Sequence, residues 1–251
     1  MSLRIPSFML AASLALTGCT ALHLGSHPAP PLSVVLFDVS QSTRDPSVRA
    51  RYLSAFERVL DYVVAERGTL VVDVIDDNPL AHSSFPIDAT FTACDPLTDN
   101  PLECDARTSR LRDDVAAEAK RILSTVSVAA GTDIHDGLLL AARVFDAYRE
   151  AGARSLVLLS DMVERSPRLN VARASSGDGL IGSTLDGFAS DGLLPDLEGV
   201  SVYVVGAGVV SDAEMPADRS LAIESFWRAY FARAGADLPT DRYGAALVRF
   251  P

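Results

Sequence analysis

The amino-acid sequence predicts an α/β protein with a doubly wound, mainly parallel central sheet, helices on both faces of that sheet and one antiparallel edge strand. Short apolar runs such as 33–37 and 155–160 are hydrophobic almost throughout, and strands without a polar face are typical of parallel sheets covered on both sides. These runs alternate with segments whose apolar residues recur at helical spacing. The chain has 251 residues, 48% of them hydrophobic, and is long enough to bury such a core.

The individual elements follow from local pattern and from the residues that end them. Segment 46–66 has apolar residues at three- and four-residue spacing and is closed by Gly68, which predicts a helix. In segment 85–93, apolar and polar residues alternate only weakly, so we expect a strand there at an edge of the sheet. The expected strands are 33–37, 69–75, 85–93, 155–160, 200–206 and 245–250, and the expected helices are 46–66, 108–126, 133–151 and 221–234. Segment 165–199, rich in Gly, Ser and Asp, is expected to be a long functional or partly disordered loop.

The charge balance argues against a nucleic-acid partner. The formal net charge is −11 and the pI is about 4.7. The sequence has no basic cluster that would neutralise phosphates, and its acidic residues are spread along the chain. This distribution indicates a solvated acidic surface.

The N-terminal residues are expected to form an export signal. Segment 1–18 has one Arg, an apolar run too short to span a membrane, and then small residues before Cys19. The letters LTGC at 16–19 resemble the lipobox of bacterial lipoproteins, in which the cysteine becomes the lipidated first residue. An ordinary signal peptide with a chance cysteine, or a buried core helix, is the alternative.

The lipobox resemblance implies a location and a division of the chain. Thr20, rather than an Asp, follows Cys19, which for the Gram-negative lipoproteins it resembles favours the outer membrane. We therefore expect a signal peptide at 1–18, lipid-anchored Cys19 with a Pro-rich tether at 19–31, and one folded domain at 32–251. The domain would belong to the cell envelope and face the periplasm or the exterior.

Two further cysteines, Cys94 and Cys104, flank the turn-rich segment DPLTDNPLE. In an exported chain, such a pair most simply forms a disulfide. The rival interpretation is a metal-binding pair, but no other Cys and no suitably spaced His completes such a site.

Small oxygen-bearing side chains gather where the predicted strands end. Asp38, Ser40 and Ser42 follow the first strand, Asp161 follows the strand at 155–160, and Thr132 lies in a Gly-containing loop before a helix. In an open parallel sheet, ligands bind outside the carboxyl ends of the strands. Two carboxylates and three hydroxyls suit a hard divalent cation, Mg²⁺ or Mn²⁺, and not zinc.

The same residues carry a family resemblance. DVSQS at 38–42, GTD at 131–133 and LLSD at 158–161 together resemble the metal-ion-dependent adhesion site of von Willebrand factor A-type (VWA) domains, over about residues 32–251. The resemblance implies a Rossmann-like VWA fold in which Ser40, Ser42 and Thr132 bind the metal directly. Asp38 and Asp161 would bind it directly or through water. The sequence departs from the family at Met162, where Gly is common, and this departure bears on the position of Asp161.

Other interpretations of single residues compete with the metal site. Ser40 and Ser42 have the residue type of helix N-caps, and Asp133 with Asp136 is expected to cap the helix at 133–151. His135 is expected on the surface of that helix. Asp76 and Asp77 follow a strand and are expected in a solvated turn. Trp227 is expected to pack in the core with a partly exposed edge.

The resemblance implies a binding module and not an enzyme. In VWA domains, a carboxylate from a protein partner often completes the metal shell, so we expect a protein partner here, with membrane attachment through Cys19. The first alternative is a phosphatase-like hydrolase with Asp38 as nucleophile. In this respect Asp38 resembles the nucleophile of the haloacid-dehalogenase phosphatases, a family that needs a second Asp two residues later and a Lys further on. This chain has Ser40 at the first of these positions, and its only lysine, Lys120, lies on a predicted surface helix. The second alternative is a structural lipoprotein whose metal site has lapsed.

Overall fold

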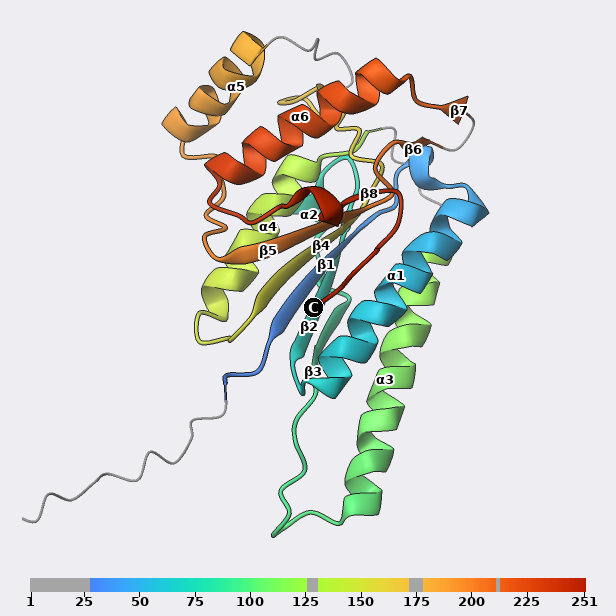
Figure 1. Cartoon of the computed structure of the whole chain (residues 1–251). Helices are drawn as coiled ribbons and strands as arrows, with labels where there is room; N and C mark the ends of the chain where they lie inside the picture. The colour runs from blue at the N-terminus through green and yellow to red at the C-terminus, as the bar shows by residue number, and fades with distance from the viewer. Residues whose placement is uncertain (1–27, 126–130, 172–177, 211–212) are drawn as a thin grey trace, which may run out of the picture.

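The fold is built around a six-stranded sheet (Figure 1). The computed structural model describes residues 28–125, 131–171, 178–210 and 213–251, so the expected signal peptide, Cys19 and most of the tether lie outside it. The strands are β1 (Leu32–Asp38), β2 (Thr69–Ile75), β3 (Ile87–Thr90), β4 (Arg154–Leu159), β5 (Val200–Val205) and β8 (Tyr243–Gly244). They are arranged in the order β3-β2-β1-β4-β5-β8, and only β3 is antiparallel to its neighbour. The predicted fold class, including the antiparallel edge strand, is confirmed.

Helices cover both faces of the sheet (Figure 1). One face packs against α1 (Pro46–Ala65) and α3 (Pro101–Ser124), and the other against α4 (Ile134–Ala147), α5 (Asp178–Ser190) and α6 (Ala217–Arg233). Alternate residues of β1 point to opposite faces, with Val34 and Leu36 in one core and Val35 and Phe37 in the other. The described residues also form α2 (Pro79–His82), a small hairpin of β6 (Val209–Val210) and β7 (Ala213–Glu214), and the 3-10 helices η1 (Gln41–Thr43) and η3 (Thr240–Arg242). Among the described residues, none of the helices is both long and apolar enough to cross a membrane.

The strand order reverses between β1 and β4. The chain leaves β1 for β2 on one side and later returns to β4 on the other, with Phe37 paired to Leu159 and Asp38 paired to Ile75. In doubly wound sheets, such a switch point opens a crevice at the carboxyl ends of the two strands. This topology is compatible with a VWA-like or Rossmann-like fold and brings the residues after β1 and β4 together.

Three sequence predictions about element bounds are wrong. Helix α3 begins at Pro101, seven residues before the predicted start, because Asn100 caps it by accepting a hydrogen bond from the Leu102 N–H at 3.0 Å. The predicted loop at 165–199 contains α5, whose three glycines weaken the helical pattern and whose Leu185 and Phe188 are buried against the core. Helix α6 begins at Ala217 rather than at residue 221.

The predicted final strand at 245–250 is also wrong, because only Tyr243–Gly244 pairs with β5. The chain beyond β8 instead contacts α1, where the Arg58 guanidinium donates hydrogen bonds to the carbonyls of Leu247 and Val248. The Phe250 ring packs on Tyr203 and Tyr62, with ring centroids 4.8 and 5.2 Å away. Contacts with α1 therefore replace the strand pairing that the apolar pattern of residues 245–250 predicted.

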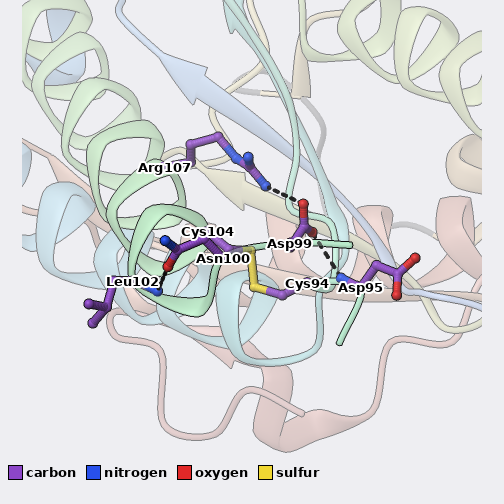
Figure 2. The surroundings of a disulfide bond; sticks show 7 residues. All are labelled: Cys94, Asp95, Asp99, Asn100, Leu102, Cys104 and Arg107. Carbon is purple, nitrogen blue, oxygen red and sulfur yellow. Dashed lines mark hydrogen bonds and ion pairs between the residues drawn. A yellow bond between two sulfur atoms is a disulfide. The ribbon is translucent and has the colours of Figure 1, made fainter. Parts of the chain in front are cut away.

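Cys94 and Cys104 form the predicted disulfide, with Cα atoms 6.0 Å apart (Figure 2). The bond joins the segment after β3 to the first turn of α3. Within the closed loop, the Asp95 N–H donates to an Asp99 carboxylate oxygen at 2.9 Å. The disulfide therefore fixes the start of α3 at the end of the sheet where β1 begins, opposite Asp38 (Figure 1).

Candidate metal centre at the carboxyl edge

The chain after β1 folds back tightly on the strand end. Asp38 and Ser40 are buried, and the Ser40 N–H donates a hydrogen bond to Asp38 Oδ1 at 2.9 Å. The hydroxyl oxygens of Ser40 and Ser42 lie 3.1 Å apart. The Thr43 hydroxyl donates to the Asp38 carbonyl at 2.7 Å and contacts the Ser40 carbonyl at 3.1 Å, which closes the turn. This turn gathers three of the predicted site residues, and Thr43, which the sequence analysis missed, holds it.

Asp161 lies beside this turn, after β4. The preceding residue, Ser160, donates its hydroxyl hydrogen to Asp38 Oδ2 at 2.7 Å and so joins the ends of β1 and β4. Asp161 Oδ1 accepts a hydrogen bond from the Val163 N–H at 2.9 Å. Asp161 Oδ2 is buried and has no hydrogen-bond partner among the described residues. A buried carboxylate oxygen left in this way calls for a retained proton or for a ligand from outside the chain.

The electrostatics of the two acids are unfavourable without a counter-charge. Burial raises the pKa of Asp38, and hydrogen bonds from Ser40 and Ser160 oppose this shift. Burial also raises the pKa of Asp161, the charge of Asp38 raises it further, and the Ser42 hydroxyl lowers it. The charges of Arg49 and Arg165 lower the pKa values of Asp38 and Asp161, respectively, but among the described residues neither arginine forms an ion pair with these carboxylates. Two adjacent buried acids of this kind favour either a retained proton or a bound cation.

Thr132 reaches the same edge from the loop before α4. Its backbone forms a two-way bridge with Arg165, with N···O distances of 3.2 and 2.9 Å, and its side chain is buried. A Cβ on the preceding Gly131 would lie 2.7 Å from the Arg165 carbonyl oxygen, so this approach requires glycine. The bridge places Thr132 beside the segment that follows Asp161.

The predicted cap of α4 is confirmed. Asp133 is the N-cap residue, and its Oδ1 accepts a hydrogen bond from the Asp136 N–H at 2.9 Å. Asp136 also forms an ion pair with Arg168 at 2.8 Å. Both acids therefore have structural roles beside the candidate site.

The predicted surface position of His135 is wrong. The side chain is fully buried, its Nδ1 lies 2.8 Å from the Tyr230 hydroxyl, and its ring stacks on Phe188 at 4.4 Å. Burial lowers the pKa of His135. The helical pattern missed this because α5 and α6, far along the chain, cover that face of α4.

Glu164 is a buried acid that the sequence analysis missed. Its Oε2 accepts hydrogen bonds from the backbone N–H groups of Ile134 and His135 at 2.7 and 3.2 Å, at the start of α4. Burial raises the pKa of Glu164 well above its ordinary value, and the charge of Asp133 adds to this. Glu164 thus ties the segment after β4 to the helix that follows Thr132.

Asp76 and Asp77 lie in a bend directly after β2, and Asp77 is exposed, as expected of a solvated turn. Together with His82 they place one potential ligand atom each within 4.8 Å of one another, and His82 Nδ1 lies 2.6 Å from Asp76 Oδ2. The hydrogen bond to Asp76 raises the pKa of His82. The Asp76 carbonyl accepts from the Asp133 N–H at 2.7 Å, so this group lies next to the Thr132 loop. It is a second possible metal group, more exposed than the first.

The donor set at the β1 and β4 ends fits a hard cation. The contacts join Asp38, Ser40, Ser42 and Asp161 into one cluster that contains only oxygen ligands, and one buried carboxylate oxygen has no protein partner. Oxygen donors of this type suit Mg²⁺ or Mn²⁺. When bound, such an ion would neutralise the two acids and would offer an unfilled coordination position to an oxygen ligand from outside the chain.

Comparisons with known proteins find no matching family model and no matching curated protein. Among solved structures, proximal thread matrix protein 1 from the mussel byssus is similar in two structures, at 13% and 14% identity and a TM-score of 0.42, over 82% of this chain and 49% and 46% of that one. The pilus adhesin SpaC from Lactobacillus rhamnosus GG is similar at 14% identity and a TM-score of 0.43, over 80% of this chain and 26% of that one. The chain thus spans about half the length of the first protein or less, and similarity at this level carries no argument about function.

Proposed function

We propose that the protein is a VWA-type binding module that holds Mg²⁺ or Mn²⁺ through Asp38, Ser40, Ser42, Thr132 and Asp161. The observation that carries this proposal is the buried pair Asp38 and Asp161, with Asp161 Oδ2 left without a hydrogen-bond partner in the described chain. Three neutral hydroxyls and two acids would at most balance the charge of the ion, and they would leave it an open coordination position. A carboxylate from a protein partner is the ligand that such an ion recognises.

The setting that we propose is the cell envelope. Acylation of Cys19 would anchor the chain in a membrane, and the segment between Cys19 and the start of β1 would act as a tether. The tether enters the sheet at the edge opposite Asp38, because Pro31 precedes β1. The metal edge would therefore face away from the attachment point and toward a partner.

The first experiment measures metal binding by the full chain in detergent. After EDTA treatment and dialysis, Mn²⁺ is titrated and the bound ion is counted by electron paramagnetic resonance. We expect one saturable site in the wild type and none in Asp38→Asn, with Asp105→Asn, an exposed acid on α3, as the matched control. At a metal concentration of 100 times Kd, the native state should gain about 2.7 kcal/mol of stability. Equal unfolding with millimolar Mn²⁺ and with EDTA would exclude the proposed site.

The second experiment addresses the partner. Envelope proteins that are cross-linked to the chain in cells should be recovered from wild type and Asp105→Asn, and lost in Asp38→Asn and after EDTA treatment. Capture that ignores both the metal and Asp38 would contradict recognition through the ion. The hydrolase alternative has a separate readout, because phosphatase turnover abolished by Asp38→Asn would support it instead.

A further inference from the structure

Met162, directly after Asp161, has a backbone conformation that side chains rarely adopt. Its φ is +64°, in the left-handed region that favours glycine. Among the described residues, Arg67 and Phe85 are the other non-glycine residues with positive φ, and both are only partly buried, whereas Met162 is completely buried. Such a conformation persists only where the surroundings enforce it.

Two side chains form hydrogen bonds with the backbone of Met162. Its N–H donates a hydrogen bond to Ser160 Oγ at 3.0 Å, and its carbonyl accepts one from Trp227 Nε1 at 2.9 Å. Trp227 belongs to α6, which packs with α4 and α5 on one face of the sheet (Figure 1). The indole is fully buried among the rings of Phe226, Tyr230 and Phe231, with centroids 5.2 to 6.0 Å away, so it has little freedom to move.

The same hydrogen bonds lead to both acids of the candidate metal centre. Ser160 Oγ accepts from Met162 and donates to Asp38 Oδ2 at 2.7 Å. Asp161 lies in the chain between Ser160 and Met162, so a change in the backbone at Met162 would turn its carboxylate. A path of three hydrogen bonds therefore runs from Trp227 through the Met162 backbone and Ser160 to Asp38.

We propose that Trp227 and Ser160 are positioning residues for the metal centre: Trp227 holds Met162 in the left-handed conformation, and this conformation orients Asp161 while Ser160 orients Asp38. The inference rests on the proposed function, since it concerns the affinity of that same site. It also accounts for a non-glycine residue at position 162, because the indole hydrogen bond compensates for the backbone strain.

The test compares Mn²⁺ affinity and stability in four forms of the full chain. Trp227→Phe removes the N–H but keeps an aromatic ring, and we expect Kd to rise about tenfold or more. Phe231→Leu, in the same buried cluster but at a side chain that cannot donate a hydrogen bond to Met162, is the control and should lower stability while leaving Kd unchanged. Adding Met162→Gly to Trp227→Phe should restore part of the affinity, because glycine adopts positive φ without strain.

The single tryptophan of the chain provides a spectroscopic readout. With ¹⁵N-labelled indole, Mg²⁺ should shift the one indole N–H resonance in the wild type and not in Asp38→Asn. Absence of Mn²⁺ binding to the wild type would overturn the proposed function and this inference together. Binding by the wild type with an unchanged Kd in Trp227→Phe would overturn the inference alone. An equal loss of affinity in Trp227→Phe and Phe231→Leu would also overturn it, because it would mean a general packing effect.

Discussion

The two ends of the parallel strands differ in how their polar groups are hydrogen-bonded. Where β1, β2 and β4 begin, backbone groups hydrogen-bond to one another, whereas where β1 and β4 end, a buried carboxylate oxygen has no hydrogen-bond partner among the described residues. At the amino edge, the Thr69 N–H donates to the Pro31 carbonyl and the Leu32 N–H to the Ala153 carbonyl, both at 2.9 Å. The approach there is so close that a Cβ on Gly152 would lie 2.1 Å from the Ala29 carbonyl oxygen. At the carboxyl edge, Asp38 and Asp161 are buried side by side.

The difference shows that the amino edge stabilises the folded state, whereas the carboxyl edge destabilises it in the absence of a ligand. Backbone hydrogen bonds and a disulfide stabilise the folded chain without any external ligand. Adjacent buried acids destabilise it unless a proton or a cation is present. We therefore expect substitutions at the two edges to have opposite effects on stability and different effects on metal binding.

Asp161→Asn should give the largest change in Mn²⁺ affinity among the variants considered. We expect Mn²⁺ affinity to fall by about a hundredfold or more, because a ligand is lost. In EDTA the same variant should be more stable than the wild type by about 1 kcal/mol, because a buried carboxylate charge is removed. Urea unfolding with and without metal measures both effects, with Asp105→Asn as control. A variant that is less stable than the wild type in EDTA would contradict the comparison of the two edges.

Removing the disulfide should lower stability and leave metal affinity unchanged, the opposite of the effects expected for Asp161→Asn. The double variant Cys94→Ser with Cys104→Ser should lose about 2–3 kcal/mol of unfolding free energy, because the unfolded chain gains the entropy of an open loop. The loss should be equal in Mn²⁺ and in EDTA, and Kd should not change. Thr98→Ser, within the same loop, serves as control. A weaker metal affinity in the double variant would show that the two edges are coupled.

Glu164→Gln should change the pH dependence of stability. The pKa of Glu164 is raised above the value of 4.5 expected in the unfolded chain, so the folded state retains a proton that the unfolded state releases. The contribution of Glu164 to stability therefore falls as pH rises above about 4.5, until the pH passes its folded-state pKa. In EDTA between pH 5 and 8, Glu164→Gln should lack this fall and gain on the order of 1 kcal/mol over the wild type toward the upper end. Parallel pH profiles for the two proteins would disprove a raised pKa.

His135 is a buried group with the opposite effect. Because its pKa is lowered, its contribution to stability rises as pH rises, and it does so equally in the wild type and in Glu164→Gln.

His82→Gln should have the smallest effect. Because His82 is largely exposed and belongs to the Asp76 and Asp77 group, we expect Mn²⁺ stoichiometry to remain one and Kd to remain unchanged. Ser40→Ala, at the β1 end, should weaken binding under the same conditions. If His82→Gln lost the bound ion and Ser40→Ala kept it, the ion would belong to the β2 end instead.

Most of the sheet and the residue types at its carboxyl edge could be predicted from the sequence. The β-branched run at 69–75 indicated a buried strand, and Asp133 with Asp136 at three-residue spacing indicated a cap, because both signals are local. The sequence missed α5 and overextended the last strand, where contacts with other elements outweigh local propensity. The roles of Ser160 and Thr43 were missed as well, since single hydroxyl residues carry no pattern.

By itself, the sequence determined the order of the first five strands of the sheet and of helices α1, α3, α4 and α6, the antiparallel edge strand, the disulfide and the set of oxygen donors after β1 and β4. These features can be predicted because they depend on hydrophobic periodicity, on the residues that begin and end each helix or strand, and on side-chain chemistry within a few positions of the sequence. Only the tertiary structure decided that His135 is buried against Tyr230, that Glu164 binds the start of α4 and that Trp227 holds Met162 at positive φ. These pairs are separated by 95, 30 and 65 residues, and such contacts form only when the packed sheet brings distant segments together.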